Sequence, residues 1–182
     1  MIRLTADELE LAQQIAANRT SMKRARGVDA NLGPKQDGTR SEVIGACGEI
    51  VAARWLGQPA PEVERPRLHG DGGIDFNVHG MTIDVKTTGS ASPALQIFPG
   101  KNLRAEIFLL VRMDLEHAAG PHGAPVGWLA IGELKSKLMQ RRPTAYREGW
   151  VPSYRIPREE LWEPDDLLQT LGLPVVRGGE PA

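Results

Sequence analysis

Alternating apolar and polar residues predict a β-hairpin in the middle of the chain. Apolar side chains occupy every second position of two short arms: Ile74, Phe76, Val78, Met81, Ile83 and Val85. Between the arms lies His79-Gly80, which we expect to form a two-residue loop. Phe76 then lies opposite Ile83. Ile74 lies opposite Val85 one step further along, so the apolar side chains share one face of the hairpin.

The same register places the charged residues of the hairpin on the opposite face. Asp75 is expected to face Asp84, and like charges at opposed positions, with Cβ atoms about 4.5–5.5 Å apart, destabilise a sheet. A divalent cation would remove this repulsion, because hard ions bind carboxylate oxygens. Lys86 lies two residues beyond Asp84 and reaches the same space. The pattern predicts either a metal site suited to activating water against a phosphodiester or, alternatively, a solvated hairpin face with several charges.

Helical patterns precede the hairpin. A first helix is expected over 5–18, opened by a capping box at Thr5–Glu8, and a second over about 39–57, opened by one at Thr39–Glu42. In the second helix, Glu49 has only small neighbours one turn away, which lets the backbone lie close to a sheet and brings this carboxylate to those of the hairpin. The alternatives are a solvent-facing Glu49, or Glu42 in its place.

Strands and short helices are expected after the hairpin. A continuous apolar run at 106–113 predicts a central strand covered on both faces, with an antiparallel neighbour at 126–132. The remaining predictions are a helix over 133–141, an edge strand over 150–156, and helices over 158–162 and 164–171. We expect a single domain over 1–172 and a loose C-terminal tail over 173–182.

Composition is that of a soluble globular protein and points to the cytoplasm. Of 182 residues, 41% are hydrophobic and 25% charged, with a formal net charge of −1. No apolar run is long enough for a membrane span, and the N-terminus lacks the form of a signal peptide. The single cysteine, Cys47, excludes an internal disulfide and a cysteine-based zinc site, and is expected in the core.

Basic residues are concentrated between Arg19 and Arg40, across an expected loop at 19–38 and the start of the second helix. The candidates for contacts with nucleic-acid phosphates are Lys23, Arg24, Arg26, Lys35 and Arg40. The alternative is a solvated loop with incidental charge. After the hairpin, Thr88 is a further candidate for a phosphate contact, and Gln96 and Lys101 are polar residues that could face the same cleft.

The order of the acidic residues resembles a known family. An Asp on one strand followed by Asp-x-Lys on the next, here Asp75 and then Asp84-Val85-Lys86, is similar to the signature of the PD-(D/E)xK, or restriction-endonuclease-like, nucleases. Ile74 stands where the motif is named for a proline, and many members place a glutamate on the preceding helix, as Glu49 does here. The resemblance covers residues 39–88.

The resemblance implies a fold and an activity. The expected fold is an α/β domain, a restriction-endonuclease-like central mixed β-sheet flanked by α-helices, with the Glu49 helix on one face and later helices on the other. The expected activity is Mg²⁺- or Mn²⁺-dependent hydrolysis of DNA phosphodiester bonds, with Asp75, Asp84 and the Val85 carbonyl as metal ligands and Glu49 binding directly or through water. Lys86 would orient or deprotonate the attacking water.

Several alternatives remain open at the level of the sequence. The domain either cuts DNA, in restriction, recombination or the processing of phage or mobile-element DNA, or binds DNA without cutting it. A structural or regulatory protein, whose hairpin charges pair with arginines of a partner, belongs to a different class. RNA is not excluded as the substrate. One metal ion or two, and a homodimer or a partner protein, are also compatible with the pattern.

Overall fold

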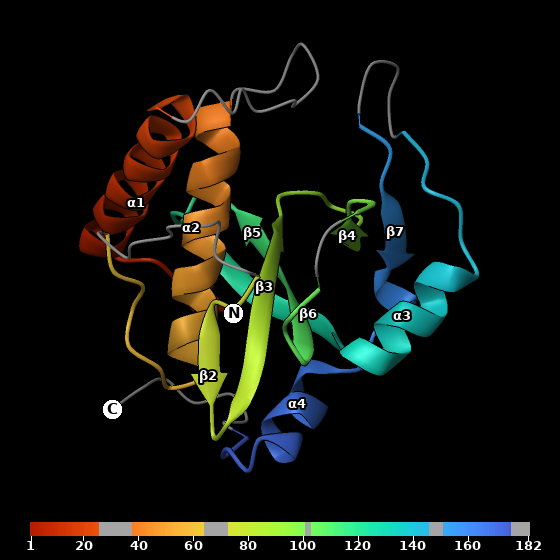
Figure 1. Ribbon diagram of the computed structural model, residues 1–182. Helices are drawn as coiled ribbons and strands as arrows, with labels where there is room; N and C mark the ends of the chain where they lie inside the picture. The colour runs from red at the N-terminus through yellow and green to blue at the C-terminus, as the bar shows by residue number, and fades with distance from the viewer. Residues whose placement is uncertain (26–37, 64–72, 101–102, 146–150, 176–182) are drawn as a thin grey trace.

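A computed structural model describes residues 1–25, 38–63, 73–100, 103–145 and 151–175 (Figure 1). In chain order its elements are β1 (Ile2–Arg3), α1 (Ala6–Ala25), α2 (Gly38–Trp55), β2 (Phe76–Val78), β3 (Met81–Thr88), β4 (Ala94–Ile97), β5 (Ile107–Asp114), β6 (His122–Ala130), α3 (Ile131–Met139), β7 (Tyr154–Pro157), a short 3₁₀-helix (Arg158–Glu160) and α4 (Pro164–Thr170). A curled mixed sheet in the order β1-β6-β5-β3-β2 carries the core, and β4 and β7 form a separate two-stranded sheet.

Strand β5 is the centre of the larger sheet, as its apolar sequence predicts. It pairs in parallel with β3 and antiparallel with β6. Its side chains alternate between two buried clusters, one on each face of the sheet. The expected antiparallel neighbour is therefore confirmed, although β6 begins earlier, at His122, and α3 already begins at Ile131.

Helix α1 begins where its capping box predicts but ends later. The Thr5 backbone N–H donates to Glu8 Oε2 at 2.8 Å, and the Glu8 N–H donates to Thr5 Oγ1 at 3.2 Å. The expectation of a loop from residue 19 is wrong over 19–25, because α1 continues to Ala25 along the side of α2 (Figure 1). The rest of that expected loop, 26–37, lies outside the described residues.

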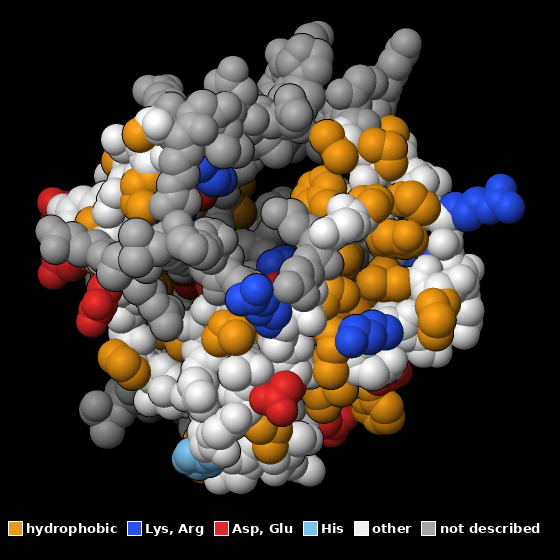
Figure 2. Space-filling view, viewed as in Figure 1, with side chains coloured by type: hydrophobic (Ala, Val, Ile, Leu, Met, Phe, Trp, Pro, Cys, Tyr) orange, Lys and Arg blue, Asp and Glu red, His pale blue; other side chains and the backbone are white. Residues whose placement is uncertain are grey.

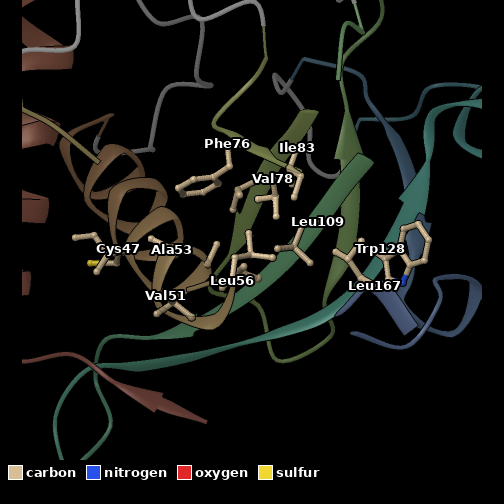
Figure 3. Packing of buried hydrophobic residues seen from close by; sticks show 14 of the residues in the cluster. Cys47, Val51, Ala53, Leu56, Phe76, Val78, Ile83, Leu109, Trp128 and Leu167 are labelled. Atoms are coloured by element: carbon tan, nitrogen blue, oxygen red, sulfur yellow. The ribbon is translucent and has the colours of Figure 1, made fainter. Parts of the chain in front are cut away.

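Helix α2 lies directly on the sheet. It begins at Gly38, so Thr39 lies inside the helix and the expected capping box there is wrong. Figure 3 shows Leu56 on the side of α2 that faces Leu109 of the sheet, whereas Cys47 lies on the side of the helix away from it; both belong to the same buried cluster, and Cys47 is fully buried. A β-carbon placed on Gly48 would lie 2.0 Å from Thr87 Oγ1, so the close approach of helix and strand depends on this glycine.

The hairpin has the predicted loop and register up to Phe76. His79 (φ 49°) and Gly80 (φ 88°) form the two-residue loop, and Phe76 pairs with Ile83. The Asp75 N–H also donates to the Ile83 carbonyl, at 2.8 Å, so two consecutive residues face one partner, as in a β-bulge. Alternation is lost there, and the prediction that Ile74 faces Val85 is wrong: Ile74 packs against the cluster on the other face of the sheet.

The C-terminal third places strands and helices on both sides of the large sheet. The expected edge strand is confirmed over 154–156 as β7, which begins only at Tyr154 and pairs with β4, a strand that the sequence pattern did not reveal. Helix α3 packs on the face opposite α2, whereas the buried leucines of α4 join the α2 side, so not all later helices lie opposite Glu49. Leu173 and Val175, expected in the loose tail, pack against the core, and 176–182 lie outside the described residues. Within the described ranges, no α-helix combines the length and apolar character that crossing a bilayer requires.

Candidate metal and phosphate site

Three of the four buried polar side chains in the described part of the chain are carboxylates. They are Glu49, Asp75 and Asp84, with exposed fractions of 7%, 7% and 4%, and the fourth is Ser153. These are the acidic residues that the sequence motif predicts. Burying an ionised carboxylate is costly unless it is paired, so each requires a donor or a cation nearby.

Asp75 is held by the backbone of the neighbouring strand. Its Oδ2 accepts a hydrogen bond from the Val85 N–H at 2.7 Å. Strand β2 begins only at Phe76, while β3 continues to Thr88. The Asp75 side chain therefore accepts a backbone hydrogen bond of β3 that a strand carbonyl would otherwise accept. The N–H and C=O of one residue in a strand point toward the same edge, so the Val85 carbonyl is directed to the side on which Asp75 lies.

Asp84 and Lys86 form a close ion pair. Lys86 Nζ donates to Asp84 Oδ1 at 2.5 Å, and the lysine side chain is 36% exposed while the aspartate is buried. Both residues lie on the face of β3 that carries Phe108 and Leu110 of β5. A β-carbon at Gly73 (φ 72°) would lie 3.1 Å from Asp84 Oδ2, so the backbone at Gly73 passes directly over this carboxylate.

Glu49 is bound by an arginine that the sequence analysis did not connect with it. Arg19 of α1 donates from Nη1 and Nη2 to the two carboxylate oxygens at 2.8 and 2.6 Å. Burial lowers the pKa of Arg19, but the hydrogen bond and charge of Glu49 outweigh it and raise the pKa above its ordinary value. The available signal was the spacing of Arg19 and Lys23, four residues apart, which places both on one side of a helix if α1 continues past residue 18.

Asp75 interacts electrostatically with both of the other carboxylates. Burial, followed by the negative charges of Glu49 and Asp84, raises the pKa of Asp75 to about 7, against the lowering effect of the Val85 N–H and Lys86. A carboxyl group with this pKa is only partly ionised near neutral pH. The structure therefore brings Glu49, Asp75, Asp84 and Lys86 together, although the predicted direct opposition of Asp75 and Asp84 is replaced by the bulge.

The donor set suits a hard divalent ion, but the described residues are not already arranged around one. No group of three or more His, Cys, Asp or Glu side chains in this part of the chain is positioned to hold a metal ion. Lys86 holds one oxygen of Asp84, and Arg19 holds both oxygens of Glu49. Oxygen ligands from Asp75, Asp84 and the Val85 carbonyl match the preference of Mg²⁺ and Mn²⁺. Metal binding at this oxygen of Asp84 would require Lys86 to move.

The basic residues expected to bind phosphates have different placements. Lys23 pairs with Glu42 and Arg40 with Glu116, so both are engaged within the chain. The side chain of Arg24 is not described, and Arg26, Lys35 and Lys101 lie outside the described residues. Thr88 and Gln96, by contrast, line a pocket together with Lys86 and with Arg155, a residue that the sequence analysis missed because β7 is far from the motif in the sequence.

Comparison with known proteins finds no relative of this chain. Protein-family models, curated proteins and solved structures give no match to this chain. The functional assignment therefore depends on the motif and on the site geometry described above.

Proposed function

We propose that this protein is a divalent-metal-dependent nuclease of the restriction-endonuclease-like type that hydrolyses phosphodiester bonds of DNA. One observation carries the proposal: Glu49, Asp75 and Asp84, the carboxylates of the motif, are the three that are buried in the described residues, and Asp84 pairs with Lys86. Charged groups buried together against their own repulsion are characteristic of functional sites. The mixed sheet with α2 packed on one face supports the same fold assignment.

The chemistry follows from the residues at the edge of β3. Mg²⁺ or Mn²⁺ would supply a Lewis acid that lowers the pKa of a bound water and polarises the phosphate. Asp75, Asp84 and the Val85 carbonyl would hold it, with Glu49 contributing directly or through water. Lys86, released from Asp84, would orient or deprotonate the attacking water and offset the negative charge that develops on the phosphate.

The ion pairs of the site favour a second candidate function. Arg19 and Lys86 partly neutralise Glu49 and Asp84 without a metal, as expected for a nuclease-like domain that binds nucleic acid but does not cut it, or for a structural or regulatory protein. Both alternatives predict that the protein performs its role without a divalent ion. The nuclease predicts that metal binds and that cleavage depends on it.

A cleavage panel tests the proposed activity. Supercoiled plasmid, single-stranded, duplex and branched DNA, and RNA would be incubated with the wild type in Mn²⁺ and in EDTA. We expect metal-dependent cutting that Lys86→Ala abolishes. The matched control is Lys135→Ala, which removes an exposed lysine of α3 and should leave cutting unchanged. Absence of cutting on every substrate, in a protein that is folded and contains its metal, would contradict the nuclease.

A further inference from the structure

A pocket of about 190 Å³ opens beside Lys86, where the end of β3 meets the two-stranded sheet. Its lining consists of Lys86, Thr87, Thr88, Ala94, Gln96, Phe98, Leu110 and Arg155. In Figure 2, Lys and Arg side chains lie to the left of and below a hollow near the middle of the molecule, and hydrophobic side chains gather over the region of β4, β7 and α3. Of the carboxylates and Lys86 described above, only Lys86 belongs to the lining.

The polar side chains of the pocket come in pairs from two different sheets. Lys86 and Thr88 are two residues apart on β3, so they point to the same face of the large sheet. Gln96 of β4 and Arg155 of β7 are direct cross-strand partners, so they share a face of the small sheet. The two sheets therefore present polar groups to the same space from opposite walls.

The chemistry of the lining suits an anion. Among the described residues that line the pocket, the charged side chains are Lys86 and Arg155, and none is a carboxylate. The Thr88 hydroxyl accepts a hydrogen bond from the Ser90 N–H at 3.1 Å, so its own O–H can donate into the pocket. The Gln96 amide donates to Ser153 Oγ at 2.8 Å, and since Ser153 is only 1% exposed, this bond fixes the amide.

We propose that this pocket binds a backbone phosphate of the nucleic-acid strand, next to the phosphate that is cleaved. Arg155 and Thr88 donate to the phosphate oxygens, while the half-buried Phe98 contacts the attached sugar or base. An arginine matches the geometry of a phosphate through two parallel N–H donors. Because Lys86 serves both the pocket and the cleavage site, a strand held here is positioned relative to the attacking water. The inference rests on the proposed nuclease function.

Binding can be measured without cleavage. Fluorescence anisotropy of a labelled short DNA strand would be recorded in EDTA over a range of salt concentrations. We expect Arg155→Gln to weaken binding about tenfold and to reduce the slope of log K against log salt by about one, because one phosphate contact is lost. Thr88→Val removes only the hydroxyl and should weaken binding by less, with the slope unchanged. Lys135→Gln, outside the pocket, should match the wild type.

The outcomes separate this inference from the proposed function. If Arg155→Gln and Thr88→Val bind as the wild type does while Lys86→Ala abolishes metal-dependent cutting, the phosphate pocket is wrong and the nuclease stands. If inorganic phosphate or a mononucleotide displaces the strand at a concentration close to that of the strand itself, the pocket serves a small ligand, and the assignment to a strand is overturned. Selective weakening by Arg155→Gln at an unchanged melting temperature supports it.

Discussion

At the scale of single residues, each buried carboxylate has an identifiable donor. Arg19 holds Glu49, Lys86 holds Asp84, and the Val85 N–H holds Asp75. Of these three donors only the Val85 N–H carries no charge, and burial together with the charges of Glu49 and Asp84 raises the pKa of Asp75 to about 7. A divalent ion would stabilise the ionised form of Asp75 and relieve its repulsion with Glu49 and Asp84. The motif predicted all four side chains of the site but not Arg19, whose contact joins residues that are far apart in the sequence.

The raised pKa of Asp75 predicts how its replacement changes stability with pH. The unfolded chain loses the Asp75 proton near pH 4 and the folded protein only near pH 7, so this carboxyl destabilises the fold increasingly as the pH rises between these values. Asn does not ionise, and its carbonyl oxygen can still accept from the Val85 N–H. Asp75→Asn should therefore raise the melting temperature in EDTA at pH 8, and by less at pH 5. An equal rise in melting temperature at pH 5 and at pH 8 would contradict the raised pKa of Asp75.

Removal of Arg19 should be costly because its ion pair with Glu49 is buried. Arg19→Gln leaves Glu49 without this cation, beside the charge of Asp75, and should destabilise the metal-free protein by about 3 kcal/mol. The matched control is Lys23→Gln, which breaks the pair with Glu42 on the same two helices. The Lys23 side chain is 47% exposed, so its loss should cost less than about 1 kcal/mol. If urea unfolding gave the same loss of stability for both variants, the buried Arg19–Glu49 pair would contribute no more to stability than the exposed Lys23–Glu42 pair.

At the scale of elements, the site depends on how closely α2 lies on β3. Gly48 touches Thr87, and Glu49 is the next residue, so the helix cannot move away without moving this carboxylate. Gly45, one turn earlier, has no atom within 4 Å of an added β-carbon, apart from its own helix and chain neighbours. Both are glycines within one helix, but only Gly48 is required by a contact.

The two glycines form a matched pair of substitutions. Gly48→Ala forces its β-carbon against Thr87 and should destabilise the protein by about 1–3 kcal/mol, with a loss of metal binding as Glu49 shifts. Gly45→Ala should stabilise it by about 0.5–1 kcal/mol, because Ala favours the helix and the space is open. Urea unfolding of both variants measures the effect. Equal destabilisation would contradict the close packing of α2 on β3.

Local patterns predicted the elements better than their ends. Alternation gave the hairpin loop and the Phe76–Ile83 pair, because both depend on neighbouring residues. It could not give the bulge at Asp75, where a side-chain oxygen accepts the hydrogen bond of the Val85 N–H in place of a strand carbonyl. Nor could it give the length of α1, which is set by packing and ion pairs with α2. The errors thus lie where long-range contacts decide the structure.

At the scale of the whole molecule, two sheets meet beside Lys86. Strands β2, β3, β5 and β6 of the larger sheet and helix α2 were predictable because their apolar positions are numerous and regular, but β1, with two residues, was not. The small sheet was not predictable, because β4 has only four residues and its partner β7 lies much later in the chain, toward the C-terminus. As a result the sequence revealed the carboxylates of the site but not the opposite wall of the pocket, which carries Arg155.

The central claim, that the three buried carboxylates are held together for a divalent ion, is tested most directly by thermal unfolding with and without metal. Bound metal stabilises the folded state by RT ln(1 + [L]/Kd), which at about 100 times Kd corresponds to a shift of roughly 5–10 °C for a chain of this size. We predict such a shift with Mn²⁺ for the wild type and none for a folded Asp84→Ala variant. An equal shift in both proteins, or no shift in the wild type, would contradict the metal site.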